Sequence, residues 1–200
     1  MKQIANDLKL QMFPESRLCK AFPMIANLFG RYTLEGDICG KCVRVYTVKF
    51  PNFGQFPLRL VARVELGSSE KFSIRVGAKP FSVSLHKIFD KNVFLSNDPI
   101  LNSRLIFSTD NSQLLRSILF YEEIRDQLCD IWTGKKHGGI LLANGGFVAY
   151  HEPFRLVTKA TRNRIKDAAR LICDVADVIK LFAAGKENSP HGNFCQFPQN

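Results

Sequence analysis

Two cysteines three positions apart, Cys39 and Cys42 in the sequence CGKC, form the short motif with the most recognisable chemistry in this chain. Thiolates at this spacing can fill two of the four ligand positions around a zinc ion. The available complement is His191 and Cys195, near the other end of the sequence. A redox site would instead need the motif to open a helix, where a thiol pKa is lowered, but here a strand is predicted to follow. We interpret Cys39 and Cys42 as cysteines of a turn, keep them as metal-ligand candidates, and predict no cofactor.

Four basic residues recur along the last predicted helix at spacings of three, four and four. This spacing places them on one face, offset by about 100° from the apolar seam of the helix. Such a stripe can lie along nucleic-acid phosphates or anionic membrane headgroups; the alternative is a solvated flank of a packed helix. This basic stripe is the candidate anion-binding site: Lys159, Arg162, Lys166 and Arg170.

A second basic surface is predicted on the polar face of a sheet. Apolar residues alternate with three arginines, Arg59, Arg63 and Arg75. A neighbouring strand adds Arg44 and Tyr46. An open sheet with arginine and aromatic side chains can receive single-stranded nucleic acid by stacking. A solvated or helix-covered face is the alternative.

A predicted strand ends with a histidine beside a glutamate, His151-Glu152. These two side chains are the candidate pair for general acid–base catalysis. The loop 133–139 has residue types that bind anions, but it lacks the spacing of a phosphate-binding loop and leads into a strand. Together these two segments support an alternative function, a small hydrolase or transferase.

The chain has 200 residues and a formal net charge of +10, from 28 Lys and Arg against 18 Asp and Glu. The basic excess is spread out and favours an anionic partner: nucleic acid, anionic lipid or an acidic protein. The length fits one domain that needs no disulfide or metal. No signal-peptide core and no window of 18 uninterrupted apolar residues is found. We therefore expect a cytoplasmic protein without a transmembrane segment.

The elements that must position these residues follow from periodicity. Residues 1–29 have apolar residues at helical spacing and are predicted as a helical segment. From 31 to 88 the period changes to two, with turn signals between the runs, which predicts an antiparallel meander of about five strands with one buried face.

The second half of the chain carries helix and turn signals. Asp98-Pro99 predicts a short helix within a polar connection at 90–103. A strand at 105–108 leads into a helix that Asp110 is expected to cap, with Gln113 completing a capping box. Its buried face is predicted to continue, in one bent helix or in two helices, through a second apolar stripe formed by Phe120, Ile124, Leu128 and Ile131.

A hairpin and a long helix complete the domain. Asn144-Gly145-Gly146 separates two strand-like runs and predicts a tight turn, because Asn and Gly tolerate positive φ. The helix from about 158 to 184 has an apolar seam at Ile165, Ala169, Ile172, Ala176 and Ile179. The predicted fold class is α+β: an antiparallel β-meander with helices packed on one face and a long C-terminal amphipathic helix. We predict a helical segment at residues 1–29, a single domain at 30–185 and a mobile tail at 186–200.

This order of elements resembles a loosely defined group of uncharacterised bacterial domains. The resemblance is carried by residues 97–99, 105–110, Leu114-Leu115, 144–146 and 171–179. Members of that group often carry membrane-spanning segments outside the domain. The resemblance implies an architecture and no activity.

Our interpretation of function is a non-enzymatic binding or assembly module that presents the basic stripe to an anionic partner. A protein partner or self-association is the remaining possibility, and residues 1–29 are the segment expected to provide it.

Overall fold

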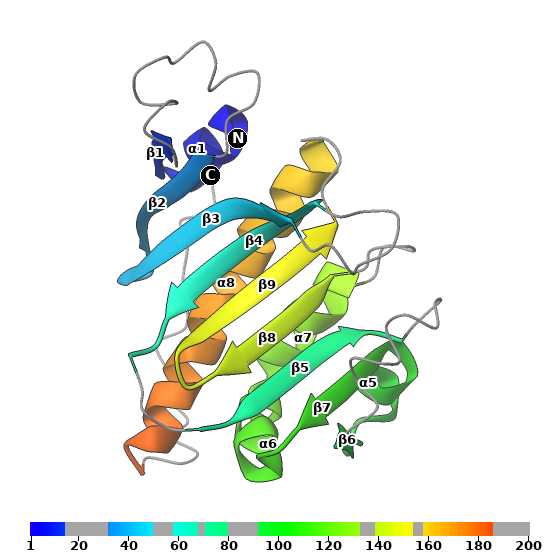
Figure 1. The fold of residues 1–200 in the computed structure, drawn as a ribbon. Coiled ribbons are helices and arrows are strands. Elements are labelled where there is room, and N and C mark those ends of the chain that lie inside the picture. Colours follow the sequence, from blue (N-terminus) through cyan, green and yellow to red (C-terminus); the bar gives the residue numbers. More distant parts are fainter. Residues whose placement is uncertain are drawn as a thin grey trace.

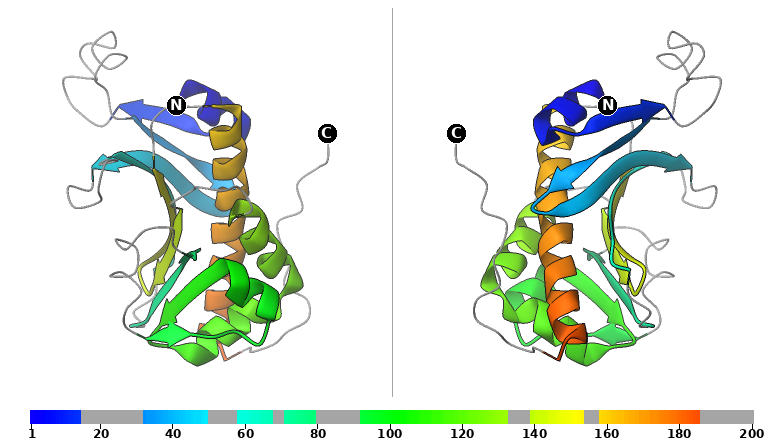
Figure 2. Two further views of the ribbon diagram at one scale, coloured as in Figure 1. Left: turned by 90° about the vertical axis from the view of Figure 1, so that its right-hand side faces the viewer. Right: turned by 90° about the vertical axis from the view of Figure 1, so that its left-hand side faces the viewer.

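The computed structural model describes residues 1–14, 32–49, 58–67, 71–79, 92–132, 139–153 and 158–185. In these residues nine strands form one antiparallel sheet, and helices cover one of its faces (Figures 1 and 2). The predicted α+β class is confirmed. No helix within the described ranges is long and apolar enough to cross a membrane.

The elements follow one another with short connections in the second half of the chain. Their bounds are α1 (Lys2–Leu8), β1 (Gln11–Pro14), β2 (Tyr32–Ile38), β3 (Lys41–Lys49), β4 (Leu58–Glu65), β5 (Ser73–Ala78), β6 (Val93–Phe94), α5 (Pro99–Arg104), β7 (Leu105–Thr109), α6 (Ser112–Phe120), α7 (Glu122–Trp132), β8 (Ile140–Asn144), β9 (Phe147–Pro153) and α8 (Lys159–Ala183).

The strand order is not the simple meander that the sequence predicted. The order is β1-β2-β3-β4-β9-β8-β5-β7-β6, so the chain leaves the meander after β4 and begins the other half of the sheet with β5. The β8–β9 hairpin, which comes later in the sequence, joins the two halves (Figure 1). Alternation of apolar residues shows that a strand has one buried face, but it contains no information on which strand lies beside it.

The helix α8 lies along the covered face and is buried as the sequence predicted. Thr158 caps it, its hydroxyl oxygen accepting from the Thr161 backbone N–H at 3.1 Å. The predicted seam is buried, and Gly185 follows the helix with φ of +68°. The helix contacts α1, α6, α7, β2, β4 and β9, so the core of the molecule is built around it.

Local turn and cap signals were mostly right. The Asp98 carboxylate accepts from the backbone N–H groups of Ile100 and Leu101, which starts α5. The predicted cap of α6 was wrong by one residue, because Asn111 caps it while Asp110 accepts from the Ser73 backbone N–H at 2.7 Å. Asp110 therefore joins the helix start to β5.

The predicted hairpin forms between β8 and β9, although neither glycine of its turn has a positive φ. The Asn144 side chain holds the turn, its Oδ1 accepting from the backbone N–H groups of Gly146 and Phe147 at 2.9 and 3.0 Å.

Residues 1–14 belong to the same core as the sheet. Ile4 and Leu8 of α1 are buried in it, as is Leu10. The prediction for 1–29, a helix or helix pairs broken near Pro14 and Pro23, was wrong at Gln11–Pro14, which form the edge strand β1 on β2. Predictions that concern 15–29, the strand at 81–85, the loop 133–138 and the tail 186–200 lie outside the described residues, and the division into segments stays a prediction.

A largely buried ion pair fixes α8 to the β2–β3 end of the sheet. The Lys41 ammonium lies 2.6 Å from the Asp177 carboxylate, and the Lys41 side chain is 9% exposed. Removing the carboxylate leaves a desolvated cation without its partner, which costs more than the pair itself contributes.

We expect Asp177→Ala to lower the free energy of unfolding by about 1–2 kcal/mol, since the Asp177 side is partly hydrated. Lys180→Ala, an exposed change on the same helix, should cost less than about 0.5 kcal/mol. Urea unfolding followed by circular dichroism measures both. Equal midpoints for the two variants would contradict the role given to this pair.

Candidate functional site

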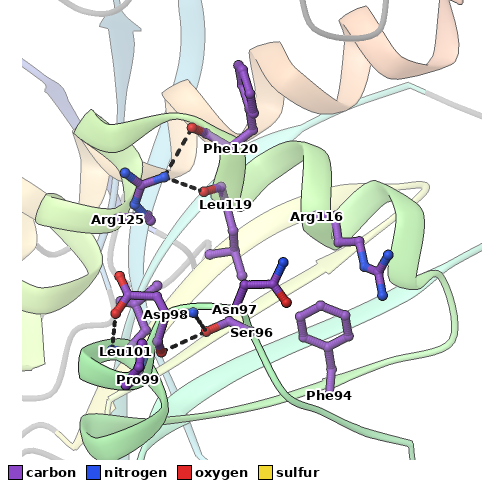
Figure 3. A pocket seen from close by; sticks show the side chains of 10 residues that line it. All are labelled: Phe94, Ser96, Asn97, Asp98, Pro99, Leu101, Arg116, Leu119, Phe120 and Arg125. Carbon is purple, nitrogen blue, oxygen red and sulfur yellow. Dashed lines mark hydrogen bonds between the residues drawn. The ribbon is translucent and has the colours of Figure 1, made fainter.

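A cavity of about 580 Å³ opens where β6, the start of α5, and the helices α6 and α7 meet (Figure 3). Its walls are mostly aromatic and aliphatic, with two arginines and one aspartate. The lining residues are Phe94, Ser96, Asn97, Asp98, Pro99, Leu101, Arg116, Leu119, Phe120 and Arg125.

The loop between β6 and α5 forms one wall and is held by side-chain hydrogen bonds. Asn102 Oδ1 accepts from the Ser96 backbone N–H at 2.9 Å, and Asn102 Nδ2 donates to the Ser96 carbonyl at 2.7 Å. Asp98 Oδ1 is occupied by the first turn of α5. These hydrogen bonds hold the wall in place and engage most of its polar groups.

The opposite wall is formed by the junction of α6 and α7. Helix α6 ends because Tyr121 takes an extended conformation, and Arg125 Nη1 donates to the carbonyls of Leu119 and Phe120 at 3.0 and 3.2 Å. The kink turns Phe120 outward against the edge of the Tyr121 ring. The predicted buried stripe was therefore wrong at Phe120, whereas Ile124, Leu128 and Ile131 are buried.

Large apolar side chains are exposed on the elements that form this cavity. Within the described part of the chain, the exposed large hydrophobic residues are Val93 (56%), Leu95 (75%), Ile100 (60%) and Phe120 (58%). Phe120 lines the cavity, whereas Val93, Leu95 and Ile100 are sequence neighbours of lining residues; the four are called the apolar rim below. Gathered apolar exposure of this kind marks interaction sites more often than isolated apolar residues do.

The predicted basic stripe is partly compensated by acidic residues. Lys159 is exposed, but Arg162 Nη1 pairs with Asp7 Oδ2 of α1 at 3.2 Å. Burial raises the pKa of Asp167, and the charges of Arg170 and Lys166 lower it, so this carboxylate lies among the stripe residues. Whether the stripe binds an anion stays a prediction.

The predicted arginine face is not brought together. Two strands, β9 and β8, separate Arg75 on β5 from β4. Arg59 is buried, and Arg63 pairs with Glu65 while its guanidinium lies 4.0 Å from the centre of the Phe147 ring. Arg44 pairs with Glu35. An arginine platform for single-stranded nucleic acid is therefore not assembled from these residues.

The cysteine motif is a hairpin turn, as interpreted. Cys39 and Gly40 connect β2 to β3, both with positive φ, which matches the twist of the two strands. Cys39 is disulfide-bonded, so it offers no thiolate to a metal. Cys42 donates to Glu35 Oε1 at 3.2 Å, and this bond raises the pKa of its thiol. Among the described residues, no group of three or more metal-ligating side chains is found.

The side chains of His151 and Glu152 do not form a pair, because successive residues of a strand point to opposite faces. The Glu152 carboxylate is buried on the helix side, where it accepts from Arg164 Nε at 2.9 Å and from the Tyr150 hydroxyl at 3.3 Å. Burial raises its pKa, against the opposing effect of Arg164. His151 lies across from Val61 on the other face. The loop 133–138, the second part of the proposed enzyme site, lies outside the described residues.

The cavity was not found from the sequence, because its lining comes from three separate segments. The signal was present in Val93, Phe94 and Leu95, a continuous apolar run inside a connection interpreted as polar.

No protein-family model matches the chain, and no curated protein sequence matches it. Among solved structures, the crystal structure of the mycobacterial trehalose monomycolate transport factor A, TtfA, is similar in fold. The two chains are 11% identical, with a TM-score of 0.50, and the match covers 90% of this chain and 92% of the other. At this identity the likeness concerns the fold alone.

His151 provides a test of the separated pair. Burial and the charges of Arg59 and Arg63 lower its pKa from 6.5 to about 4, whereas a glutamate partner would raise it. Between these two values the unfolded chain binds a proton that the folded chain does not, so stability falls as the pH falls from 6.5 towards 4.

We expect the loss of stability between pH 7 and pH 4.5 to be about 2–3 kcal/mol smaller in His151→Gln than in the unmodified protein. Urea unfolding at both pH values measures the difference. The contribution of the carboxylates to the change in stability is the same in both proteins and cancels. An imidazole that titrates near pH 6.5 in the folded protein by NMR would show that this account of His151 is wrong.

Proposed function

We propose that this chain is a non-catalytic binding module whose ligand enters the cavity between β6, α5 and the α6–α7 junction. The observation that carries the proposal is a 580 Å³ cavity formed by the same elements that expose the apolar rim. Sites for small molecules span about 300–1,000 Å³ and combine apolar walls with few polar groups. Phe120 lines the cavity and is 58% exposed, so a ligand there would cover an apolar side chain that otherwise stays in water.

The polar groups of the cavity support binding more than catalysis. Ser96, Asp98 and Arg125 are engaged in holding the surrounding backbone. Acid–base or nucleophilic chemistry needs such groups within reach of each other and of a substrate. The alternative, a small hydrolase or transferase, has no observation in its favour, since His151 and Glu152 face opposite sides of the sheet.

The net charge of +10 favours an anionic partner, and the basic stripe remains the proposed second contact for nucleic acid, an anionic membrane surface or an acidic protein. TtfA is named as a transport factor, and a carrier role for this chain is an argument from fold alone. A cytoplasmic location stays a prediction, and the disulfide at Cys39 argues against it, because disulfides are rare in the reducing cytosol.

Filling the cavity tests the proposal. The neutral apolar dye N-phenyl-1-naphthylamine should bind with one site per chain and gain fluorescence. Asn97→Trp places an indole at a lining position and should weaken this binding at least about tenfold, since it displaces the dye. Asn163→Trp, at an exposed position of α8, is the matched control. Absence of dye binding, or equal binding by both variants, would overturn the proposal.

The basic stripe is tested separately by Lys159→Glu with Lys166→Glu, which leaves the Arg162–Asp7 pair in place. If the stripe binds phosphates, this double variant should lose affinity for a DNA oligonucleotide or for phosphatidylglycerol vesicles, with a smaller dependence on salt. Unchanged affinity and salt dependence in fluorescence anisotropy and sedimentation would remove the stripe from the proposal.

A further inference from the structure

Two polar side chains of the cavity, Arg116 and Asn97, form no hydrogen bond or ion pair within the described part of the chain. Arg116 projects from α6, and its guanidinium carbon lies 5.9 Å from the centre of the Phe94 ring (Figure 3). The ring forms the apolar wall directly beside the cation. The cavity therefore combines one available positive charge with a hydrocarbon surface.

The charge of the lining favours an anion over a cation. Two arginines, Arg116 and Arg125, face one carboxylate, Asp98, so the lining carries a net charge of +1. Asp98 Oδ1 accepts from two backbone N–H groups at the start of α5. The positive end of that short helix turn and the engaged hydrogen bonds leave this carboxylate little capacity to attract a cationic ligand.

We infer that the ligand of this cavity is an acidic amphiphile, with a carboxylate or phosphate head on Arg116 and a hydrocarbon chain along Phe94, Leu101, Leu119 and Phe120. This inference rests on the proposed function and names its ligand class. Charge-assisted bonds from a guanidinium to such a head group are among the stronger polar contacts in proteins.

A peptide fits the same walls less well. Every peptide unit brings an N–H and a C=O that need partners once water is removed. The Ser96 hydroxyl and Asp98 Oδ1 already bond to neighbouring backbone or to Asn102, and Arg125 Nη1 donates to two carbonyls. The Arg116 guanidinium and the Asn97 amide form none of these bonds, and they suit a single head group better than the repeated N–H and C=O groups of a peptide backbone.

The experiment is competition against bound N-phenyl-1-naphthylamine, with dodecanoate, dodecanol and dodecyltrimethylammonium below their micelle or solubility limits. Dodecanoate should displace the dye from the unmodified protein at the lowest concentration. Arg116→Gln should weaken dodecanoate about tenfold or more, since one charged hydrogen-bonding partner is lost, and should leave dodecanol unchanged. Arg104→Gln, an exposed arginine outside the lining, is the matched control.

The possible outcomes separate the two proposals. Equal competition by dodecanoate and dodecanol, or an equal loss in Arg104→Gln, overturns the acidic head group while dye binding still supports a binding module. Absence of dye binding overturns both. Competition by phosphatidylglycerol vesicles, not by phosphatidylcholine vesicles, that is lost in Arg116→Gln supports the same chemistry with a membrane as its source. Stronger competition by an acidic peptide than by dodecanoate overturns the inference.

Discussion

The fold depends on the burial of one helix, α8, between the sheet and the other helices. Twelve of its residues are buried, including Ile165, Ile172 and Ile179 of the predicted seam. Burying an isoleucine side chain contributes about 1.5–3 kcal/mol relative to leaving it in water. Because α8 contacts strands from the first half of the sheet and the β9 strand that joins the halves, this burial also holds the crossed strand order together.

Polar contacts along α8 fix its position more than they stabilise it. Each joins the helix to a different element, so any slide of α8 would break several at once. Desolvation offsets much of the Coulomb energy of such pairs, but a charge left buried without its partner is costly. The contacts are Lys41 with Asp177, Arg162 with Asp7, Arg164 with Glu152, and Gln127 with Asp174.

The sequence predicted the features that depend on neighbouring residues and missed those that depend on distant ones. Asp98 and Asn144 act within three residues of their own positions, so cap and turn rules located them. Arg75 and Phe120 were misplaced because their surroundings are set by strand order and by the bend between α6 and α7. The cavity was missed for the same reason, since no single segment contains it.

The cavity lies at the β6 edge of the sheet, away from the core that is built around α8. Around α8 the polar groups bond within the core: the buried Glu152 carboxylate accepts from Arg164 and from the Tyr150 hydroxyl. At the β6 edge the strand is two residues long, and the apolar side chains of Val93 and Leu95 are exposed there. Such a surface is costly for an isolated chain and useful for a chain that binds an apolar ligand. Arg116 lies beside Phe94 at this edge and adds a preference for a ligand with an anionic head group, which apolar burial alone does not provide.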